Sequence, residues 1–338
     1  MRRLISPIIA VAVGGFLIGI AYRRFLDDPS GASVANYLRS GLHAMLIAVF
    51  GLAANLYFNV RASRWLRTWP IVAEIALRAV AMAIAIAAVI AALQVAIYDQ
   101  PPPTAWLLGD FPRIIALSFI LSAVFGAVYE LVRLIGGRVL MSVILGRYRH
   151  PTREDRVLMF LDLAGSTSLA EALGEVRMQE LLTRFFFDID DTIVAHGGEV
   201  HAYVGDEVIV SWPLSAEVLG GACVDCFFAV KDRIEASADT YQREFGSVPR
   251  FRAALHAGPV VIGECGDSHR QIAYFGDSMN VTARLQEHCK GVGRSLLVSA
   301  DLLKRVRPGP GLTVAALGNA TLRGRLAAVE IFAVERRT

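Results

Sequence analysis

The stretch Val157-Leu-Met-Phe-Leu-Asp162-Leu-Ala-Gly-Ser-Thr-Ser168 sets the pattern of the C-terminal half of this 338-residue chain. Its first five residues are all apolar, which is typical of a short strand in the centre of a sheet. Asp162 ends this run, and Ser166 or Thr167 can cap a helix that carries residues 170–174. A carboxylate at a strand tip, beside the free N–H groups of a helix start, suits a metal ion and phosphates. A structural cap is the competing interpretation of Asp162.

Strands and helices follow this stretch without strict alternation. Apolar residues at helical spacing predict a long helix from Arg177 to the stop at Gly197-Gly198. Two β-rich runs flank Gly205-Asp206-Glu207 and predict a hairpin with an acidic tip. Further elements are predicted as a Cys-containing helix at 217–235, a strand, a Gly-Pro break and a second strand within 250–262, strands at 271–275, 296–298, 313–317 and 328–334, and helices that reach Cys289 and cover 300–306. This order favours an α+β fold over a doubly wound sheet.

A second informative stretch is Tyr274-Phe-Gly-Asp-Ser-Met-Asn-Val-Thr-Ala-Arg-Leu285. Gly276 permits a tight turn and the next two residues can cap a helix, so Asn280 and Arg284 project from one helix face. A guanidinium offers a fork of donors to phosphate, and an amide can orient a ribose or phosphate oxygen. A solvated helix face has the same spacing, so this stretch alone leaves both interpretations open.

Composition divides the chain into two unlike halves. The hydrophobic fraction is 54%, and the excess of apolar residues lies before residue 137. The formal net charge of +3 gives no argument for nucleic acid, and we expect no such partner. Cys223 and Cys226 form a C-x-x-C inside a helix-like run, where small buried thiols are the expected interpretation and a metal or redox site is the alternative. No G-x-x-x-x-G-K-[S/T] occurs, which excludes a P-loop.

Four apolar segments in the N-terminal half are long enough to cross a bilayer. They are Leu4–Tyr22, Leu42–Val60, Ala79–Tyr98 and Ile114–Tyr129 with a few residues beyond. The first lacks a small-x-small cleavage site and other spans follow it, so we expect a retained helix rather than a signal peptide. Glu74 and Arg78 are spaced to pair on one helix face at the start of the third span, as an interfacial pair or as part of a sensing site.

Arginines in the short loops predict the orientation of these spans. Arginine favours the cytoplasmic side of a membrane, so we expect both the N-terminus and the C-terminal domain in the cytoplasm, with the spans in the cell inner membrane. Arg23 and Arg24 lie on the opposite side and are partly offset by Asp27 and Asp28. The supporting residues are Arg61, Arg64 and Arg67 after the second span, and Arg133, Arg138, Arg147 and Arg149 after the fourth.

We therefore expect three regions along the chain. Residues 1–136 form a four-helix transmembrane domain, 137–155 a linker with an amphipathic helix and a polar hinge at 147–156, and 156–338 a catalytic domain. A linker of this kind suits a relay from membrane to cytoplasm, and a passive spacer would look the same.

Four motifs stand in one order in the C-terminal half and together resemble the catalytic domain of class III nucleotidyl cyclases. They are Phe160-Leu-Asp-Leu-Ala-Gly-Ser-Thr167, Val204-Gly-Asp-Glu207, Arg252-Ala-Ala-Leu-His-Ala-Gly258 and Gly276-Asp-Ser-Met-Asn-Val-Thr-Ala-Arg284. The resemblance covers about residues 152 to 338 and implies a ferredoxin-like domain that acts as a head-to-tail homodimer. It implies conversion of ATP to cyclic AMP and pyrophosphate with two Mg²⁺ or Mn²⁺ ions per active site. The N-terminal half is similar to bacterial membrane anchors in general.

The resemblance also implies roles for individual residues. Asp162 and Asp206 would bind the two ions with help from the backbone near Leu163, and Gly165, Ser166 and Thr167 would bind substrate phosphates. The partner chain would supply Asn280 and Arg284 to orient the ribose and stabilise charge on the α-phosphate. Arg323 or Arg325 would contact the terminal phosphates where the family uses a Lys.

Two positions depart from the family pattern. The adenine-reading Lys and its Asp or Thr partner fall at Ala202 and Ala273, neither of which can read a base edge. Base choice must then rest on backbone groups or on neighbours such as His201, Tyr203 or Gln271. Adenylate cyclase is the leading function. Guanylate cyclase and a catalytically silent, nucleotide-binding membrane receptor are the alternatives.

Overall fold

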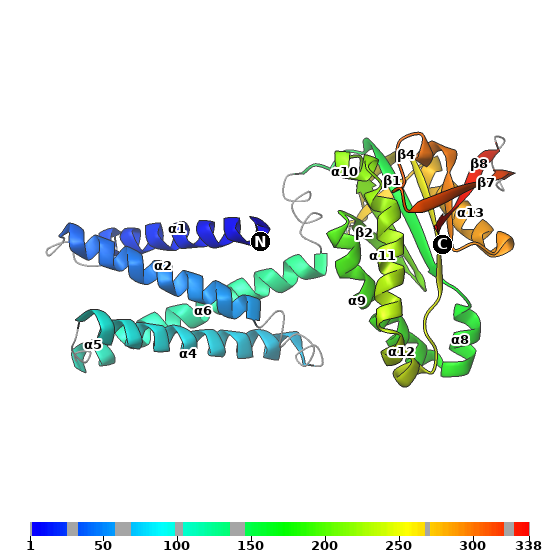
Figure 1. Cartoon of the computed structure of the whole chain (residues 1–338). Coiled ribbons are helices and arrows are strands. Elements are labelled where there is room, and N and C mark those ends of the chain that lie inside the picture. The colour runs from blue at the N-terminus through cyan, green and yellow to red at the C-terminus, as the bar shows by residue number, and fades with distance from the viewer. Residues whose placement is uncertain are drawn as a thin grey trace. The chain divides into compact units, whose positions relative to one another are not determined.

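The computed structural model describes residues 2–25, 33–57, 69–98, 104–135, 146–267, 271–320 and 328–337. The chain divides into two compact units, Met1–Met141 and Ser142–Thr338 (Figure 1). Each unit has its own secondary structure: the first is helical and the second contains a sheet with helices on both faces.

The N-terminal unit is built from apolar helices. Its described elements are α1 (Arg2–Phe25), α2 (Val34–Tyr57), α4 (Ile71–Tyr98), the short α5 (Thr104–Leu108) and α6 (Asp110–Ile135). Four of these helices are long and apolar enough to cross a membrane, which confirms the predicted helices. Each of the four begins before the apolar run that predicted it, because a helix continues through polar residues that end a hydropathy peak.

Small residues and one charged group mark the helix contacts of this unit. A Cβ on Gly19 of α1 would collide with the Ser40 carbonyl oxygen of α2, so glycine lets these two helices approach closely. Within α4, Arg78 pairs with Glu74, as the sequence spacing predicts, and Arg78 Nη1 lies 3.5 Å from Glu130 Oε1 on α6. Both carboxylates are buried, so the charges of this group face one another rather than lipid.

The C-terminal unit contains a mixed sheet, which confirms the predicted α+β class. The strand order is β2-β3-β1-β4-β6-β8-β7, with β5 paired to β4. The β4–β6 pair is parallel and the other pairs are antiparallel. The elements are β1 (Thr152–Leu163), α8 (Ser166–Leu173), α9 (Glu175–Ala195), β2 (Glu199–Val204), β3 (Glu207–Pro213), α10 (Ala216–Leu219), α11 (Ala222–Ala236), α12 (Ala238–Phe245), β4 (Phe251–Cys265), β5 (Gln271–Phe275), α13 (Asp277–Val292), β6 (Leu296–Ser299), α14 (Ala300–Leu303), β7 (Leu312–Ala320) and β8 (Val329–Arg336).

Two apolar clusters hold helices against the sheet. Alternate residues of β1, such as Met159 and Leu161, pack with α9 and α11, which lie side by side in Figure 1. On the other face, Leu285 of α13 packs with Ala254 and Leu297. Strand β1 therefore has one buried face toward α9 and α11 and one face toward α13, and residues on the second face can take part in a site.

Two details of the strands differ from the sequence prediction. β1 begins at Thr152 and pairs with β4 from there, so part of the expected hinge at 147–156 is strand. β4 continues through Gly258-Pro259, where a break was predicted. Ser278 Oγ donates to the Pro259 carbonyl oxygen over 2.9 Å, so this residue turns its backbone polar side toward α13 rather than into the ladder with β1. Proline therefore costs no ladder hydrogen bond at this position.

Candidate active site

Asp162 lies near the end of β1, on the face of the sheet that α13 covers. The neighbouring positions Leu161 and Leu163 point into the core on the opposite side and are almost fully buried. Leu163 can therefore offer only backbone atoms to a site. Asp162 is half-buried between two partner strands, directly opposite Glu207 on β3 and Arg252 on β4.

The β2–β3 hairpin brings Asp206 to Asp162, as the two acidic tips of the sequence suggested. Val204 pairs with Glu207 across the turn, and Gly205 adopts a φ of 62° that favours glycine. The Asp206 carboxyl is within hydrogen-bonding reach of Asp162, and burial together with this neighbour raises the pKa of Asp162. A carboxyl group from the end of β1 and one from the β2–β3 turn thus lie next to each other.

A third carboxyl group, Glu207, adds negative charge that the sequence prediction did not use. Burial raises its pKa to about 7, and the charges of Asp162 and Asp206 act in the same direction. Gln286 Nε2 donates to Asp162 Oδ2 over 2.9 Å and counteracts part of this repulsion. The sequence gives no signal for this contact, because Gln286 is 124 residues from Asp162 and meets it only through the packing of α13 on β1.

The turn after β1 supplies free backbone donors. Gly165, with a φ of 77°, occupies the cap position of α8, and no side chain caps the helix. The prediction that Ser166 or Thr167 caps it is therefore wrong: both residues lie within the first turn of α8. Their N–H groups remain available for an anion, because the first N–H groups of a helix have no partner within it.

This set of side chains fits divalent cations of the Mg²⁺ type. Carboxylate oxygens are the ligands that Mg²⁺ prefers, and it is commonly bound through one or two carboxylates together with substrate phosphates and water. Within the described residues, no group of three or more His, Cys, Asp and Glu side chains is arranged to enclose a metal. Asp162 and Asp206 therefore fit a site in which backbone, water and nucleotide complete the coordination.

Helix α13 carries Asn280 and Arg284 on its solvent side. Asn280 is exposed, and Arg284 Nη1 donates to both carboxylate oxygens of Glu287 over 2.9 and 3.0 Å. At about 100° per residue, Gln286 lies about 120° around the helix from Asn280 and about 160° from Arg284. The face of α13 that contacts Asp162 is therefore not the face that presents Asn280 and Arg284.

The two alanines at the expected base-reading positions lie on strands at the edge of this region. Ala202 is on β2 opposite Ile209, and Ala273 is on β5 opposite Gly263. Their neighbours His201 and Tyr274 stack on each other with ring centroids 3.9 Å apart. Burial and the charge of Arg156 lower the pKa of His201 to about 4, which keeps the imidazole neutral. Arg323 and Arg325 lie outside the described residues.

The two cysteines of the C-x-x-C lie on α11, across the sheet from this site. Cys223 and Cys226 are buried in α11, and burial raises the pKa of each thiol to about 12. Such thiols stay protonated and unreactive near neutral pH. This agrees with the prediction that the C-x-x-C cysteines are small buried thiols.

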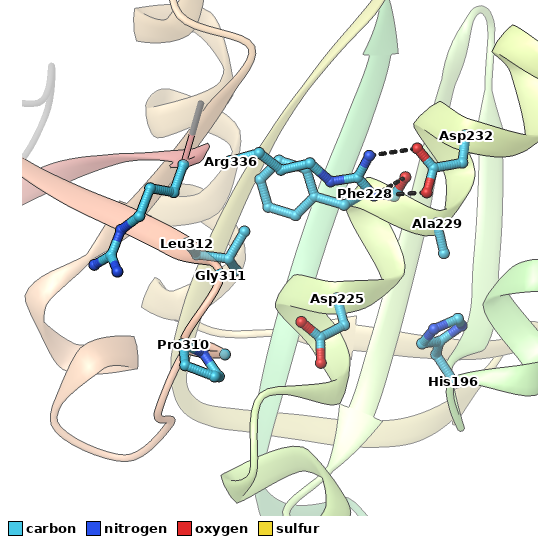
Figure 2. Close-up of a pocket in the computed structure, with 11 residues that line it drawn as sticks. His196, Asp225, Phe228, Ala229, Asp232, Pro310, Gly311, Leu312 and Arg336 are labelled. Carbon is cyan, nitrogen blue, oxygen red and sulfur yellow. Dashed lines mark hydrogen bonds and ion pairs between the residues drawn. The ribbon is translucent and has the colours of Figure 1, made fainter.

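A separate cavity of about 530 Å³ lies against α11, in the helical layer across the sheet from α13. Figure 2 shows its lining, in which both carboxylate oxygens of Asp232 receive donors from Arg336 over 2.5 and 2.6 Å. Of the residues predicted for the active site, none that the structure describes lines this cavity. The carboxylate pair at the end of β1, rather than this cavity, is the candidate active site.

Comparison with known proteins identifies the C-terminal unit. The family model described as the adenylate and guanylate cyclase catalytic domain matches residues 149–335. Adenylate cyclase 2 of Rhizobium meliloti (strain 1021) is 45% identical over 192 residues, which cover 57% of this chain and 53% of that protein. Adenylate cyclase 1 of the same strain is 29% identical over 187 residues, 54% of this chain and 28% of that protein. The chain thus spans about half or less of the length of these relatives.

A solved structure shows the same fold. The structure of a bacterial light-regulated adenylyl cyclase superimposes with a TM-score of 0.56 and 22% identity, covering 66% of this chain and 65% of that chain. The C-terminal unit therefore has a fold that is also found in that solved structure.

Proposed function

The chain belongs to the family of adenylate and guanylate cyclase catalytic domains, and we propose that it is a membrane-anchored adenylate cyclase that converts ATP into 3′,5′-cyclic AMP and pyrophosphate. The observation that carries this proposal is the pair of carboxyl groups, Asp162 and Asp206, which meet beside the uncapped start of α8. The choice of adenine over guanine rests on the 45% identity to adenylate cyclase 2.

Asp162 and Asp206, with the backbone of Leu163, would hold two Mg²⁺ or Mn²⁺ ions. When bound, these ions lower the pKa of the 3′-hydroxyl and neutralise charge on the phosphates. The mutual repulsion of Asp162, Asp206 and Glu207 supports this assignment, because a divalent cation relieves it.

In the reaction, the 3′-oxygen of the ribose forms a bond to the α-phosphorus while the bond to the pyrophosphate oxygen breaks. The 3′-hydroxyl proton passes to water, and pyrophosphate leaves with its negative charge. The N–H groups of Gly165, Ser166 and Thr167 would bind phosphate oxygens, and Arg323 or Arg325 would hold the terminal phosphates. No side-chain general base is required, because the bound cations would lower the pKa of the ribose 3′-hydroxyl enough for water to accept its proton.

Asn280 and Arg284 would act in the active site of the partner chain in a homodimer. Asn280 would orient the ribose, and Arg284 would stabilise the charge that develops on the α-phosphate. The arrangement of α13 supports this: one helix cannot turn Gln286 toward its own Asp162 and also turn Arg284, about 160° away, to the same place. Arg284 would exchange its bonds to Glu287 for bonds to phosphate when the nucleotide enters.

The N-terminal unit would anchor the enzyme in a bacterial inner membrane. Four helices can cross a bilayer, and α4 and α6 bury their charged groups against each other. The arginine distribution in the loops supports a cytoplasmic N-terminus and a cytoplasmic catalytic domain, where ATP is available. We further propose a membrane domain at 1–136 and a linker that begins at 137. The catalytic domain would begin before the expected residue 156, because β1 starts at Thr152 and the family model starts at residue 149.

The test is turnover by the full-length protein, purified in detergent or nanodiscs. With MgATP or MnATP we expect cyclic AMP and pyrophosphate in equal amounts, and a lower rate of cyclic GMP formation from GTP. Asp162→Ala and Asp206→Ala should each abolish turnover while the thermal unfolding midpoint stays near that of the wild type. A faster reaction with GTP would reassign the enzyme as a guanylate cyclase, and binding of ATP without any product would make it a silent receptor.

A further inference from the structure

Gln286 contacts the candidate metal site from a direction that the proposed mechanism does not use. Its amide nitrogen donates to Asp162 Oδ2 over 2.9 Å, and its side chain is half-buried. Leu285 and Cys289, on the adjoining face of α13, are fully buried against the sheet. The helix is therefore fixed about its own axis, and the amide is held where it meets the carboxylate.

We propose that Gln286 is a positioning residue that holds one oxygen of Asp162 and leaves the other free for the divalent cation. The proposal rests on the proposed function, because it assigns Asp162 to the metal. Asp162 has Asp206 and Glu207 as neighbours, whose like charges repel its carboxylate, and the Gln286 donor offsets part of that repulsion. Hydrogen bonds to metal-binding carboxylates orient them and contribute to metal affinity.

A neutral amide suits this position better than a charged side chain. A lysine or arginine here would cancel the negative charge that attracts the cation, and a glutamate would add a further carboxylate without a donor. Glutamine supplies the N–H group and leaves the charge of the site unchanged. The side-chain type at position 286 therefore matches a role in orientation.

Helix α13 then serves two active sites of a homodimer. Its Gln286 face holds Asp162 of its own chain, and its Asn280 and Arg284 face acts in the site of the partner. The role of Gln286 consequently belongs to the chain that supplies Asp162, not to the chain that receives help from Arg284.

The first test measures metal binding without turnover. Free Mn²⁺ is followed by electron paramagnetic resonance while it is titrated into the full-length protein with adenosine 5′-(α,β-methylene)triphosphate, whose α–β link cannot be cleaved. Gln286→Met keeps the length of the side chain but removes the donor, and we expect it to weaken Mn²⁺ binding about tenfold. The Mn²⁺ concentration for half-maximal activity should rise by the same factor, with a smaller change in kcat at saturating Mn²⁺.

Gln242→Met on α12 is the matched control, because that amide also donates a hydrogen bond, to the Gly246 carbonyl oxygen over 3.0 Å, in a helix away from the site. It should leave Mn²⁺ binding unchanged. Equal Mn²⁺ affinity in the wild type and Gln286→Met overturns the proposal even if cyclic AMP is made. A loss of Mn²⁺ affinity in Gln286→Met from a protein that makes no cyclic nucleotide would instead support it while refuting the proposed function.

A second test locates the effect within the dimer. Co-expressed Asp206→Ala and Arg284→Ala chains form mixed dimers with one intact site, whose Asp162 comes from the Arg284→Ala chain. Gln286→Met in that chain should raise the Mn²⁺ requirement about tenfold. Placed in the Asp206→Ala chain, it lies in the site that is already inactive and should leave the requirement unchanged. The reverse result would mean that Gln286 supports Asn280 and Arg284 through the helix, and would overturn the proposal.

Discussion

If each active site combines Asp162 and Asp206 of one chain with Asn280 and Arg284 of its partner, two inactive variants must restore each other. Asp206→Ala and Arg284→Ala are each expected to be inactive as homodimers. In a mixed dimer, one site carries both lesions and the other carries neither. Random pairing makes about half of the dimers mixed, and each has one intact site of two, so about one quarter of wild-type activity should return.

A site formed within one chain would give a different recovery of activity, and the geometry of α13 favours the shared site. If Arg284 acted on Asp162 and Asp206 of its own chain, every site would contain one lesion and no activity would return. The structure turns Gln286 toward Asp162 and turns Arg284 to Glu287 on another face of the helix, which favours the shared site.

The assay is cyclic AMP formation from MnATP by chains co-expressed with two different affinity tags and purified through both. Dual-tag purification selects mixed dimers, so the expected activity rises to about half of the wild type. The matched control mixes Asp162→Ala with Asp206→Ala chains, whose lesions fall on the same half of the site, and should show no recovery. No recovery with Asp206→Ala and Arg284→Ala, from a preparation shown to contain mixed dimers, would refute the shared site.

Further predictions concern the stability of the catalytic domain and the packing of α13 against β4. The pKa of His201 is lowered from 6.5 to about 4 in the folded protein, so protonation of His201 favours the unfolded chain. The free energy of unfolding is therefore highest above pH 6.5 and falls by up to about 3 kcal/mol as the pH decreases to 4. His201→Gln should reduce the decrease of the thermal unfolding midpoint between pH 7 and pH 5. Tyr241 donates to the buried Asp188 over 2.9 Å, so Tyr241→Phe should cost about 1.5 kcal/mol and Asp188→Ala about 3 kcal/mol, measured by thermal unfolding at pH 7; an equal effect of the two changes would contradict this ranking. A Cβ at Gly258 would collide with Ser278 Oγ at the start of α13 and displace that helix from the sheet. Gly258→Ala should therefore lower kcat at least about tenfold, and adding Ser278→Ala should recover part of the lost activity. A fully active Gly258→Ala enzyme would show that the packing of α13 against β4 is not critical for turnover.

The sequence predicted the acidic tips because each is local. An apolar run that ends at Asp162 and a hairpin turn at Asp206 are encoded within about ten residues each, and the strand and turn preferences of those residues act without help from the rest of the chain. The same holds for the four apolar helices, whose length and composition alone predict that they can cross a membrane.

Three features differ from what these local patterns predicted, and the second and third depend on residues that are distant in the sequence. Gly165 occupies the N-cap position of α8, because a glycine with positive φ can make the turn without a side-chain cap. Ser166 and Thr167 therefore lie in the first turn of the helix. β4 passed through Gly258-Pro259, where the Pro259 carbonyl oxygen accepts a hydrogen bond from Ser278 Oγ on another element. Glu207 joined the two aspartates because the β1–β3 register places it directly opposite Asp162.

The sequence by itself determined which residue types are present and which local element carries each, because propensity, capping and hydropathy act over a few neighbouring residues. Only the tertiary structure decided that Asp162 and Asp206 share one place, that Gln286 holds Asp162 across 124 residues of chain, and that Arg284 faces away from both. The physical reason is that strand register and helix rotation are set by burial of the core faces of β1 and α13, and burial depends on partners that no local stretch contains.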